Sequence, residues 1–221
     1  MNFRDIAEQN ENWIIEQRRY FHAHPELSFE EKNTTHEIGK CLEEMGLTPH
    51  YYPDYNGLWA IIKGGKSTPG SKTVALRADI DALPVEEHTG LTFCSQNPGV
   101  MHACGHDGHA TIGLGVAKVL MSIKDQLHGT VKLIFQPAEE GVRGAKSIVD
   151  NGHLDGVDYL IGSHVTNKKE DDPAVVIPGS YGSLATTKYD VIFHGKSAHA
   201  GGSPEVGRNV MLAVGEEGRS E

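Results

Sequence analysis

Apolar residues recur at helical spacing in the N-terminal part of the chain. Over residues 3–24, aromatic and aliphatic side chains are spaced among charged ones in a way that predicts a helix. The string HPELS ends this pattern, and Ser28 with Glu31 has the S-x-x-E form of a capping box. We therefore predict a second helix from this point to about Met45, stopped by Gly46.

Strand-like and helix-like segments alternate in the middle of the chain. The strings GLWAIIKG, KTVALRADI, GTVKLIFQP and VDYLIGSHV predict four strands, and we expect the last to be buried. Residues 108 to about 124 follow a helical pattern, and GVRGAKSIVDNG predicts a shorter helix. This alternation predicts an α/β fold with a parallel or mixed sheet. Small residues in the longer helix would let it pack closely on the sheet: Ala110, Gly113, Gly115 and Ala117.

The pattern changes after Pro173. Alternating, β-rich sequence is followed by a loop and a helix that we expect to begin near Pro204. We predict a domain boundary near residue 184. It would separate a metal-binding α/β domain, residues 1–184, from the first part of a second domain, residues 185–221.

Charge and hydropathy exclude two classes of partner. Lys and Arg total 20 against 30 for Asp and Glu, so the formal net charge is -10. That balance repels phosphate backbones, and we expect no nucleic-acid partner. Charged residues interrupt the apolar ones well before the ~20 apolar residues that a membrane span requires. We therefore expect no membrane association either.

The cysteines indicate the compartment. Residues 1–11 are polar and acidic and do not resemble a signal peptide. The chain has 3 cysteines, an odd number that argues against a disulfide framework. We therefore expect a cytoplasmic protein with reduced thiols.

Histidine, the commonest metal ligand, occurs 13 times and gathers in one string. MHACGHDGHA, residues 101–110, holds three histidines, a cysteine and an aspartate. Cys104 and His106 are two positions apart, so both would reach one cation from an extended or irregular segment. Asp107 is placed to cap the following helix. A structural cysteine beside surface histidines is the alternative for this segment taken alone.

Further candidate groups stand at the ends of predicted strands. Glu139 and Glu140 follow one strand, and we expect their side chains to diverge, so that one binds metal while the other acts as general base. His164 ends another strand, and Asp79 with Asp81 could accept a hydrogen bond from a ligating histidine. Because ligands in open α/β sheets gather at the carboxyl ends of strands, this pattern predicts metal-assisted hydrolysis. A solvated acidic turn and a core histidine are the alternatives.

The strings RADIDALP, MHACGHDGH, IFQPAEEG, SHV and SAHAGGSP, in this order, resemble the M20 family of metallopeptidases and amidohydrolases. The resemblance extends to about Ala213 and is strongest to the group of hippurate, indoleacetyl-amino-acid and p-aminobenzoyl-glutamate hydrolases. It implies an incomplete α/β/α metallopeptidase domain followed by the start of an α+β lid that forms a dimer. It also implies a metal-dependent amidohydrolase that cleaves N-acyl amino acids with an aromatic acyl group, such as p-aminobenzoyl-glutamate.

The resemblance implies a role for each candidate residue. Glu139 corresponds to the general base, and Asp81 to an aspartate beside the ligands. His199 corresponds to a lid histidine that, in such dimers, reaches the partner subunit's site and binds the carbonyl oxygen or substrate carboxylate. Two divalent cations, Mn or Zn, would be held by a mixed set of ligands: Cys104, His106, Glu140 and His164.

Members of the family continue well past this length. The sequence stops within the first helix of the lid, and its tail VGEEGRSE does not continue that helix. We therefore expect a truncated chain or a fragment that lacks one metal ligand. Two other functions stay open at this point. The chain could be a non-catalytic subunit that joins a companion chain through its lid, or a structural zinc protein that uses Cys104 and His106.

Overall fold

The computed structural model describes residues 2–141, 144–165 and 191–211. The chain divides into two units, Met1–Lys169 and Glu170–Glu221. The domain boundary predicted near residue 184 lies outside the described residues. Within the described ranges, every helix is too short or too polar to cross a membrane.

A five-stranded mixed sheet forms the centre of the first unit, in the order β1-β2-β4-β3-β5. Strand β3 runs parallel to both β4 and β5, whereas β2 runs antiparallel to β4 and to β1. The α/β fold with a mixed sheet is therefore confirmed. The strands are β1 (His50–Tyr51), β2 (Leu58–Lys63), β3 (Thr73–Asp79), β4 (Thr130–Gln136) and β5 (Tyr159–Gly162).

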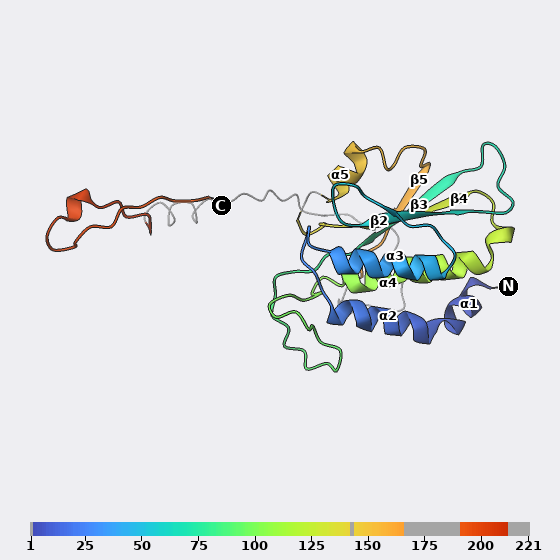
Figure 1. The fold of residues 1–221 in the computed structure, drawn as a ribbon, viewed down its shortest axis with the longest axis horizontal. Helices are drawn as coiled ribbons and strands as arrows, with labels where there is room; N and C mark the ends of the chain where they lie inside the picture. Colours follow the sequence, from blue (N-terminus) through green and yellow to red (C-terminus); the bar gives the residue numbers. More distant parts are fainter. Residues whose placement is uncertain (1, 142–143, 166–190, 212–221) are drawn as a thin grey trace. The chain divides into compact units, whose positions relative to one another are not determined.

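Helices cover both faces of this sheet. Helices α2, α3 and α4 lie along one face, and α5 lies on the other (Figure 1). Helix α4 connects β3 to the parallel strand β4 and packs on both. The helices are α1 (Phe3–Gln9), α2 (Glu11–Ala23), α3 (Lys32–Glu44), α4 (His106–Ser122) and α5 (Gly144–Asp150), with a 3-10 turn at Lys124–Gln126.

Strand β4 is buried on both of its faces. Leu133 and Phe135 point into the larger core between the sheet and helices α2, α3 and α4. Ile134, between them, points into a smaller core with Tyr52 and Ile148, the latter on α5. Successive side chains of a strand face opposite ways, so a central strand covered on both faces is apolar at consecutive positions.

The small residues of α4 allow close packing, as the sequence predicts. A Cβ atom on Gly113 would lie 2.9 Å from the ring of Phe135 and 3.2 Å from Ala78 Cβ. Gly115 faces helix α2 instead, where a Cβ atom would lie 3.4 Å from Ile14. The helix therefore approaches the sheet and its neighbouring helix through different glycines.

Substituting Gly113 by alanine is expected to lower the free energy of unfolding by about 1–2 kcal/mol, because overpacking outweighs the gain in helix propensity. Gly115→Ala is the matched control, since its Cβ atom would meet only ordinary van der Waals contact. Chemical denaturation of both variants checks the prediction. Equal stability of the two proteins would contradict this account of the packing.

Two expectations about the N-terminal helices are wrong. The helix expected over residues 3–24 is divided at Asn10, whose side-chain amide donates to the Ile6 carbonyl at 2.7 Å. The capping box is absent, because α3 begins at Lys32 without a side-chain cap. The Ser28 hydroxyl donates instead to Asp81 at 2.6 Å, and Glu31 accepts from a distant backbone N–H. Both side chains therefore form hydrogen bonds with residues distant in the sequence and do not cap the helix.

Strand β5 is exposed rather than buried. Tyr159 is 60% exposed, and Leu160 and Ile161 are more than half exposed. Among the described residues β5 pairs only with β3, so it is an edge strand of the described sheet.

The described part of the second unit is short. An isolated antiparallel bridge joins Lys196 to Arg208. The segment Pro204–Val206 forms a 3-10 turn, so the expectation of a helix beginning near Pro204 is wrong. The bridge pairs Lys196 with a residue just beyond this turn, and Arg208 donates to the Lys196 carbonyl at 2.8 Å.

Candidate metal centre

Three parallel strands bring the predicted site residues to one edge of the sheet. Asp79 at the end of β3 is level with Gln136 at the end of β4, and Arg77 is level with Gly162 at the end of β5. The segments that follow these strands therefore leave from the same edge. Helix α4 begins there as well, at His106, so the candidate ligands converge at the carboxyl ends of the strands.

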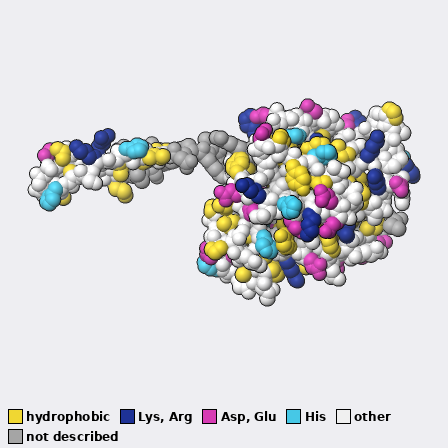
Figure 2. Space-filling model, in the orientation of Figure 1, with side chains coloured by type: hydrophobic (Ala, Val, Ile, Leu, Met, Phe, Trp, Pro, Cys, Tyr) yellow, Lys and Arg dark blue, Asp and Glu magenta, His cyan; other side chains and the backbone are white. Residues whose placement is uncertain are grey.

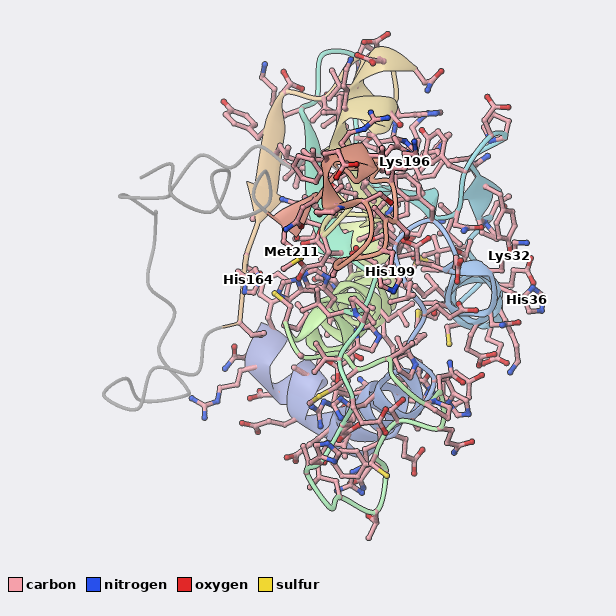
Figure 3. The ribbon with its side chains drawn as sticks, turned by 90° about the vertical axis from the view of Figure 1, so that its left-hand side faces the viewer. Lys32, His36, His164, Lys196, His199 and Met211 are labelled. Carbon is pink, nitrogen blue, oxygen red and sulfur yellow. The ribbon has the colours of Figure 1, made fainter. Side chains whose placement is uncertain are left out.

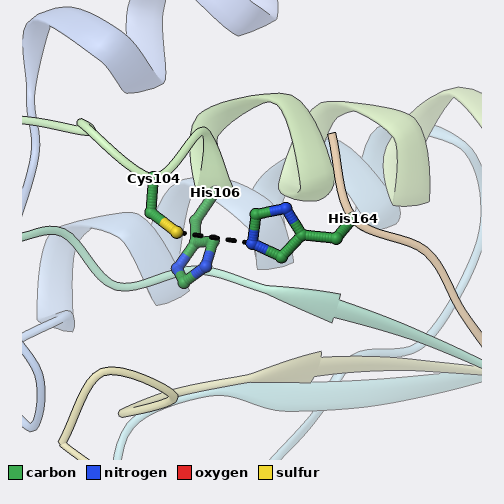
Figure 4. Close-up of side chains that lie close together, drawn as sticks. All are labelled: Cys104, His106 and His164. Atoms are coloured by element: carbon green, nitrogen blue, oxygen red, sulfur yellow. Dashed lines mark hydrogen bonds between the residues drawn. The ribbon is translucent and has the colours of Figure 1, made fainter. Parts of the chain in front are cut away.

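Cys104, His106 and His164 form a cluster (Figure 4). The sulfur and one nitrogen of each ring lie within 4.8 Å of one another, and Cys104 Sγ is 3.3 Å from His164 Nε2. Cys104 lies in irregular structure, one of the two conformations expected for this segment, and His106 is the first residue of α4. Gly105, in the left-handed region with φ 89°, turns the chain and directs both side chains to the same side.

Hydrogen bonds fix the tautomer of the neutral His106 ring and leave its lone pair on Nε2. Its Nδ1 lies 3.0 Å from the Asp81 carbonyl oxygen and 3.1 Å from Asp81 Oδ1, which only accept. The ring proton is therefore on Nδ1. The opposite nitrogen, Nε2, is buried and has no hydrogen-bond partner within the described part of the chain. A buried acceptor without a donor is costly, and a cation would satisfy it.

His164 is in the same tautomeric state. Its Nδ1 donates to the Val165 carbonyl at 2.6 Å, so the lone pair on Nε2 faces Cys104. His164 follows β5, in the position shown in Figure 3. Two imidazole lone pairs and one sulfur thus converge, and this donor set fits Zn and other borderline divalent cations.

Glu139 and Glu140 approach the same place. Each offers a carboxylate oxygen within 4.8 Å of the other and of His106. The expectation that they diverge is wrong, because the chain turns at Ala138, which has φ 50°. Glu139 Oε2 lies 3.9 Å from His106 Nε2 and Oε1 lies 4.0 Å from Arg77. Two carboxylates so close repel each other, and a divalent cation between them would offset this repulsion.

Asp81 accepts hydrogen bonds from three elements. Besides His106, Ser28 Oγ donates to it at 2.6 Å and the Glu140 backbone N–H at 2.9 Å. Burial acts to raise the pKa of Asp81, but these hydrogen bonds, that from His106 first, bring it below the usual range. Asp81 is therefore an ionised carboxylate that orients the His106 ring, as expected beside a metal ligand.

The electrostatic potential at the site is negative. Burial and the neighbouring carboxylates, Glu140 foremost, raise the pKa of the Cys104 thiol to about 12. A thiolate at this position requires a compensating positive charge. The carboxylates that oppose ionisation of Cys104 would attract a divalent cation, which supplies that charge.

Charge is mixed on the face of the first unit that Figure 2 shows. In Figure 2, Lys and Arg side chains lie among Asp and Glu side chains on the visible face, rather than in one basic patch.

Asp107 has a structural role different from the one expected. Gly105, rather than Asp107, is the N-cap of α4. The Asp107 carboxylate accepts from His22 at 2.7 Å and from Arg18 at 2.9 Å. It thus ties α2 to the first turn of α4 and supports the segment that carries His106.

His199 belongs to the second unit and is labelled in Figure 3. The Gly201 backbone N–H donates to His199 Nδ1 at 3.2 Å. The proton of the His199 ring is therefore on Nε2, which can donate a hydrogen bond.

Sequence reasoning missed His109. It lies three residues after His106 on α4, buried beside Asp79, with its Nδ1 3.3 Å from Asp79 Oδ2. The signal available in the sequence was its spacing, because residues i and i+3 share a helix face. Asp79 was expected to accept a hydrogen bond from a ligating histidine, and the histidine that it contacts is His109.

Comparison with known proteins identifies the family. Residues 75–218, more than half of the chain, match peptidase family M20/M25/M40. An indole-3-acetyl-aspartic acid hydrolase from Enterobacter agglomerans is 48% identical over 170 residues, covering 73% of this chain and 38% of that protein. A Haemophilus influenzae homolog of one p-aminobenzoyl-glutamate hydrolase subunit is 37% identical, covering 92% of this chain and 57% of that protein.

A solved structure shares the fold. A dinuclear metal-binding peptidase of the M20 family from Bacillus subtilis superposes with a TM-score of 0.68 at 42% identity, over 72% of this chain and 44% of that one. The chain therefore spans only part of the length of these relatives, between 38% and 57%. The resemblance predicted from the sequence motifs is confirmed: the chain belongs to the M20/M25/M40 family of peptidases.

Proposed function

We propose that the protein is a metal-dependent amidohydrolase that cleaves the amide bond of N-acyl amino acids with an aromatic acyl group, such as p-aminobenzoyl-glutamate. The proposed metal ligands are Cys104, His106, Glu140 and His164. The observation that carries the proposal is the convergence of Cys104 Sγ with the lone pairs of His106 and His164, with Glu139 and Glu140 beside them. A closed structural zinc site would not need two carboxylates in addition to these donors.

A pair of divalent cations, Mn or Zn, would polarise the substrate carbonyl and lower the pKa of a water molecule. Glu139 is the proposed general base. Its side chain is 39% exposed while its carboxylate lies 3.9 Å from His106, so it can reach both the site and an incoming substrate. Glu139 would take the proton of the attacking water and return it to the nitrogen of the departing amino acid.

His199 is proposed to donate from Nε2 to the carbonyl oxygen as negative charge develops there. The hydrogen bond from Gly201 supports this role, since it keeps the proton on Nε2. In line with the family resemblance, we propose that residues 185–221 begin a lid and that His199 acts in the site of a partner subunit. The assembly would be a homodimer or a heteromer, in the cytoplasm, where the free thiols of Cys41 and Cys94 stay reduced.

Hydrolysis of three substrates tests the proposal. The protein is stripped of metal, reloaded with Mn²⁺ or Zn²⁺, and given p-aminobenzoyl-glutamate, hippurate or indoleacetyl-aspartate. We expect kcat/KM for p-aminobenzoyl-glutamate to exceed the others at least ~10-fold, the effect of about 1.4 kcal/mol of added binding in the transition state. Equal rates on all three would contradict the named substrate, and no hydrolysis by the metal-loaded full-length protein would contradict the amidohydrolase function.

A further inference from the structure

The ring of His109 joins two segments of the first unit. On one side its Nδ1 lies 3.3 Å from Asp79 Oδ2. On the other side its Nε2 accepts the backbone N–H of Val165 at 3.1 Å. Because a backbone N–H can only donate, Nε2 carries no proton, and Nδ1 is the donor to Asp79. His109 is buried, so this connection is shielded from water.

His109 is not itself available to a cation. Asp79, His106 and His109 lie close enough to suggest a second metal group. However, the lone pair of His109 already accepts from Val165, and Arg77 holds the other oxygen of Asp79 at 2.6 Å. A chain of polar contacts thus runs from Arg77 through Asp79 and His109 and ends on a backbone amide.

That amide belongs to the residue after the proposed ligand His164. The rings of His109 and His164 meet edge to face, with centroids 4.5 Å apart and an interplanar angle of 88°. Among the described residues the preceding strand β5 pairs with β3 alone, so the sheet supports this segment from one side only. The position of His164 therefore depends on how Val165 is held.

The side chain of Val165 packs against the first turn of α4. A Cβ atom on Gly105 would lie 2.5 Å from Val165 Cγ2, and one on Gly108 would lie 3.8 Å from Val165 Cγ1. The absence of a side chain at Gly105 is thus what admits the valine. His109, one residue after Gly108, accepts the backbone N–H of Val165 on Nε2. His164 donates from Nδ1 to the Val165 carbonyl. Both polar groups of the Val165 backbone are satisfied by histidines.

We propose that His109 is a positioning residue that anchors the backbone of Val165 and so keeps His164 Nε2 directed at Cys104 Sγ. The Arg77–Asp79 pair maintains the tautomer that this anchor requires. The inference rests on the proposed metal site and adds a residue that binds no cation but determines where one ligand lies.

Two variants that differ by one methylene group test the anchor. His109→Gln can place an amide oxygen near the position of Nε2, where it accepts from Val165. His109→Asn can still contact Asp79 but is too short to reach Val165. His102→Asn is the control, because it also removes a buried imidazole, one without hydrogen-bond partners in the described ranges.

The affinity for Zn²⁺ is measured by competition with a chromophoric chelator, and ligand geometry by the absorption spectrum of the Co²⁺-loaded protein. We expect His109→Asn to weaken Zn²⁺ binding about 10–100-fold and to change the Co²⁺ spectrum, as is usual when a group that orients a ligand is lost. His109→Gln and His102→Asn should stay close to the unsubstituted protein. Thermal unfolding of the metal-free proteins shows whether a change follows general stability instead.

Three outcomes would overturn the inference in distinguishable ways. If His164→Ala binds Zn²⁺ as tightly as the unsubstituted protein, the proposed metal site fails and the anchor with it. If His164→Ala loses affinity while His109→Asn keeps both affinity and spectrum, the metal site stands and only the anchor fails. A loss in His109→Asn matched by His102→Asn would also overturn it.

Discussion

Replacing Glu139 by glutamine is expected to lower kcat for p-aminobenzoyl-glutamate at least ~10³-fold while the metal content stays unchanged. Glutamine keeps the shape of the side chain but cannot take a proton, and general-base catalysis contributes roughly 10²–10⁴-fold. Glu139 and Glu140 are both partly exposed, and Arg77 lies 4.0 Å from the Glu139 carboxylate. Steady-state kinetics and elemental analysis of the purified variant check both parts of the prediction.

The neighbouring residue supplies the matched control. Glu140→Gln makes the same chemical change one position along the chain, at a proposed ligand. We expect it to lose metal as well as activity, because a neutral amide is a weaker ligand than a carboxylate. If Glu139→Gln retained near-normal turnover, or if it lost metal as Glu140→Gln does, the division of roles between the two carboxylates would be wrong.

Substituting His106 by alanine is the second large effect that we expect. His106 is fully buried, its Nδ1 is held by Asp81, and its Nε2 has no partner among the described residues. Removal of this ligand should weaken Zn²⁺ binding by more than ~10²-fold and abolish hydrolysis. It should also remove the stabilisation that bound metal provides, about 2.7 kcal/mol at a concentration 100 times Kd.

Thermal unfolding with and without Zn²⁺ measures this second effect, together with isothermal titration of the metal. The Zn²⁺ affinity of Asp81→Asn should fall between those of the unsubstituted protein and His106→Ala. This substitution weakens the orientation of His106 but does not remove the proposed ligand. His36→Ala is the control for loss of a histidine, since His36 is exposed on α3 (Figure 3). A Zn²⁺-dependent rise in unfolding temperature that persists in His106→Ala would contradict the proposed site.

Asp81, Ser28 and Glu31 show why local patterns misled the interpretation of the N-terminal region. The S-x-x-E spacing is a valid signal for a helix start, and α3 does begin directly after Glu31. Yet the Ser28 hydroxyl bonds to a residue 53 positions away, and the Glu31 carboxylate to one 107 positions away. Hydrogen-bonding side chains satisfy the nearest suitable partner in space, and sequence spacing does not reveal that partner.

The histidines of the string 101–110 make the same point at the site. His102, His106 and His109 are all histidines and are all buried. They differ only in what surrounds them. His106 has an open lone pair, His109 has its lone pair on a backbone amide, and burial lowers the pKa of His102 to about 4, so that ring is neutral. A sequence identifies candidate ligands, whereas the tautomer and the free lone pair depend on the neighbours.

The sequence by itself determined four of the strands and the approximate positions of the longer helices in the first unit, because hydrophobic periodicity and turn residues act over a few neighbouring positions. It also determined the family, through motifs that carry the proposed metal ligands. Only the tertiary structure decided that Glu139 and Glu140 stay close together, that β5 is an exposed edge, and that His109 serves Val165. These features follow from contacts between segments brought together by the sheet, and such contacts leave no periodic trace along the chain.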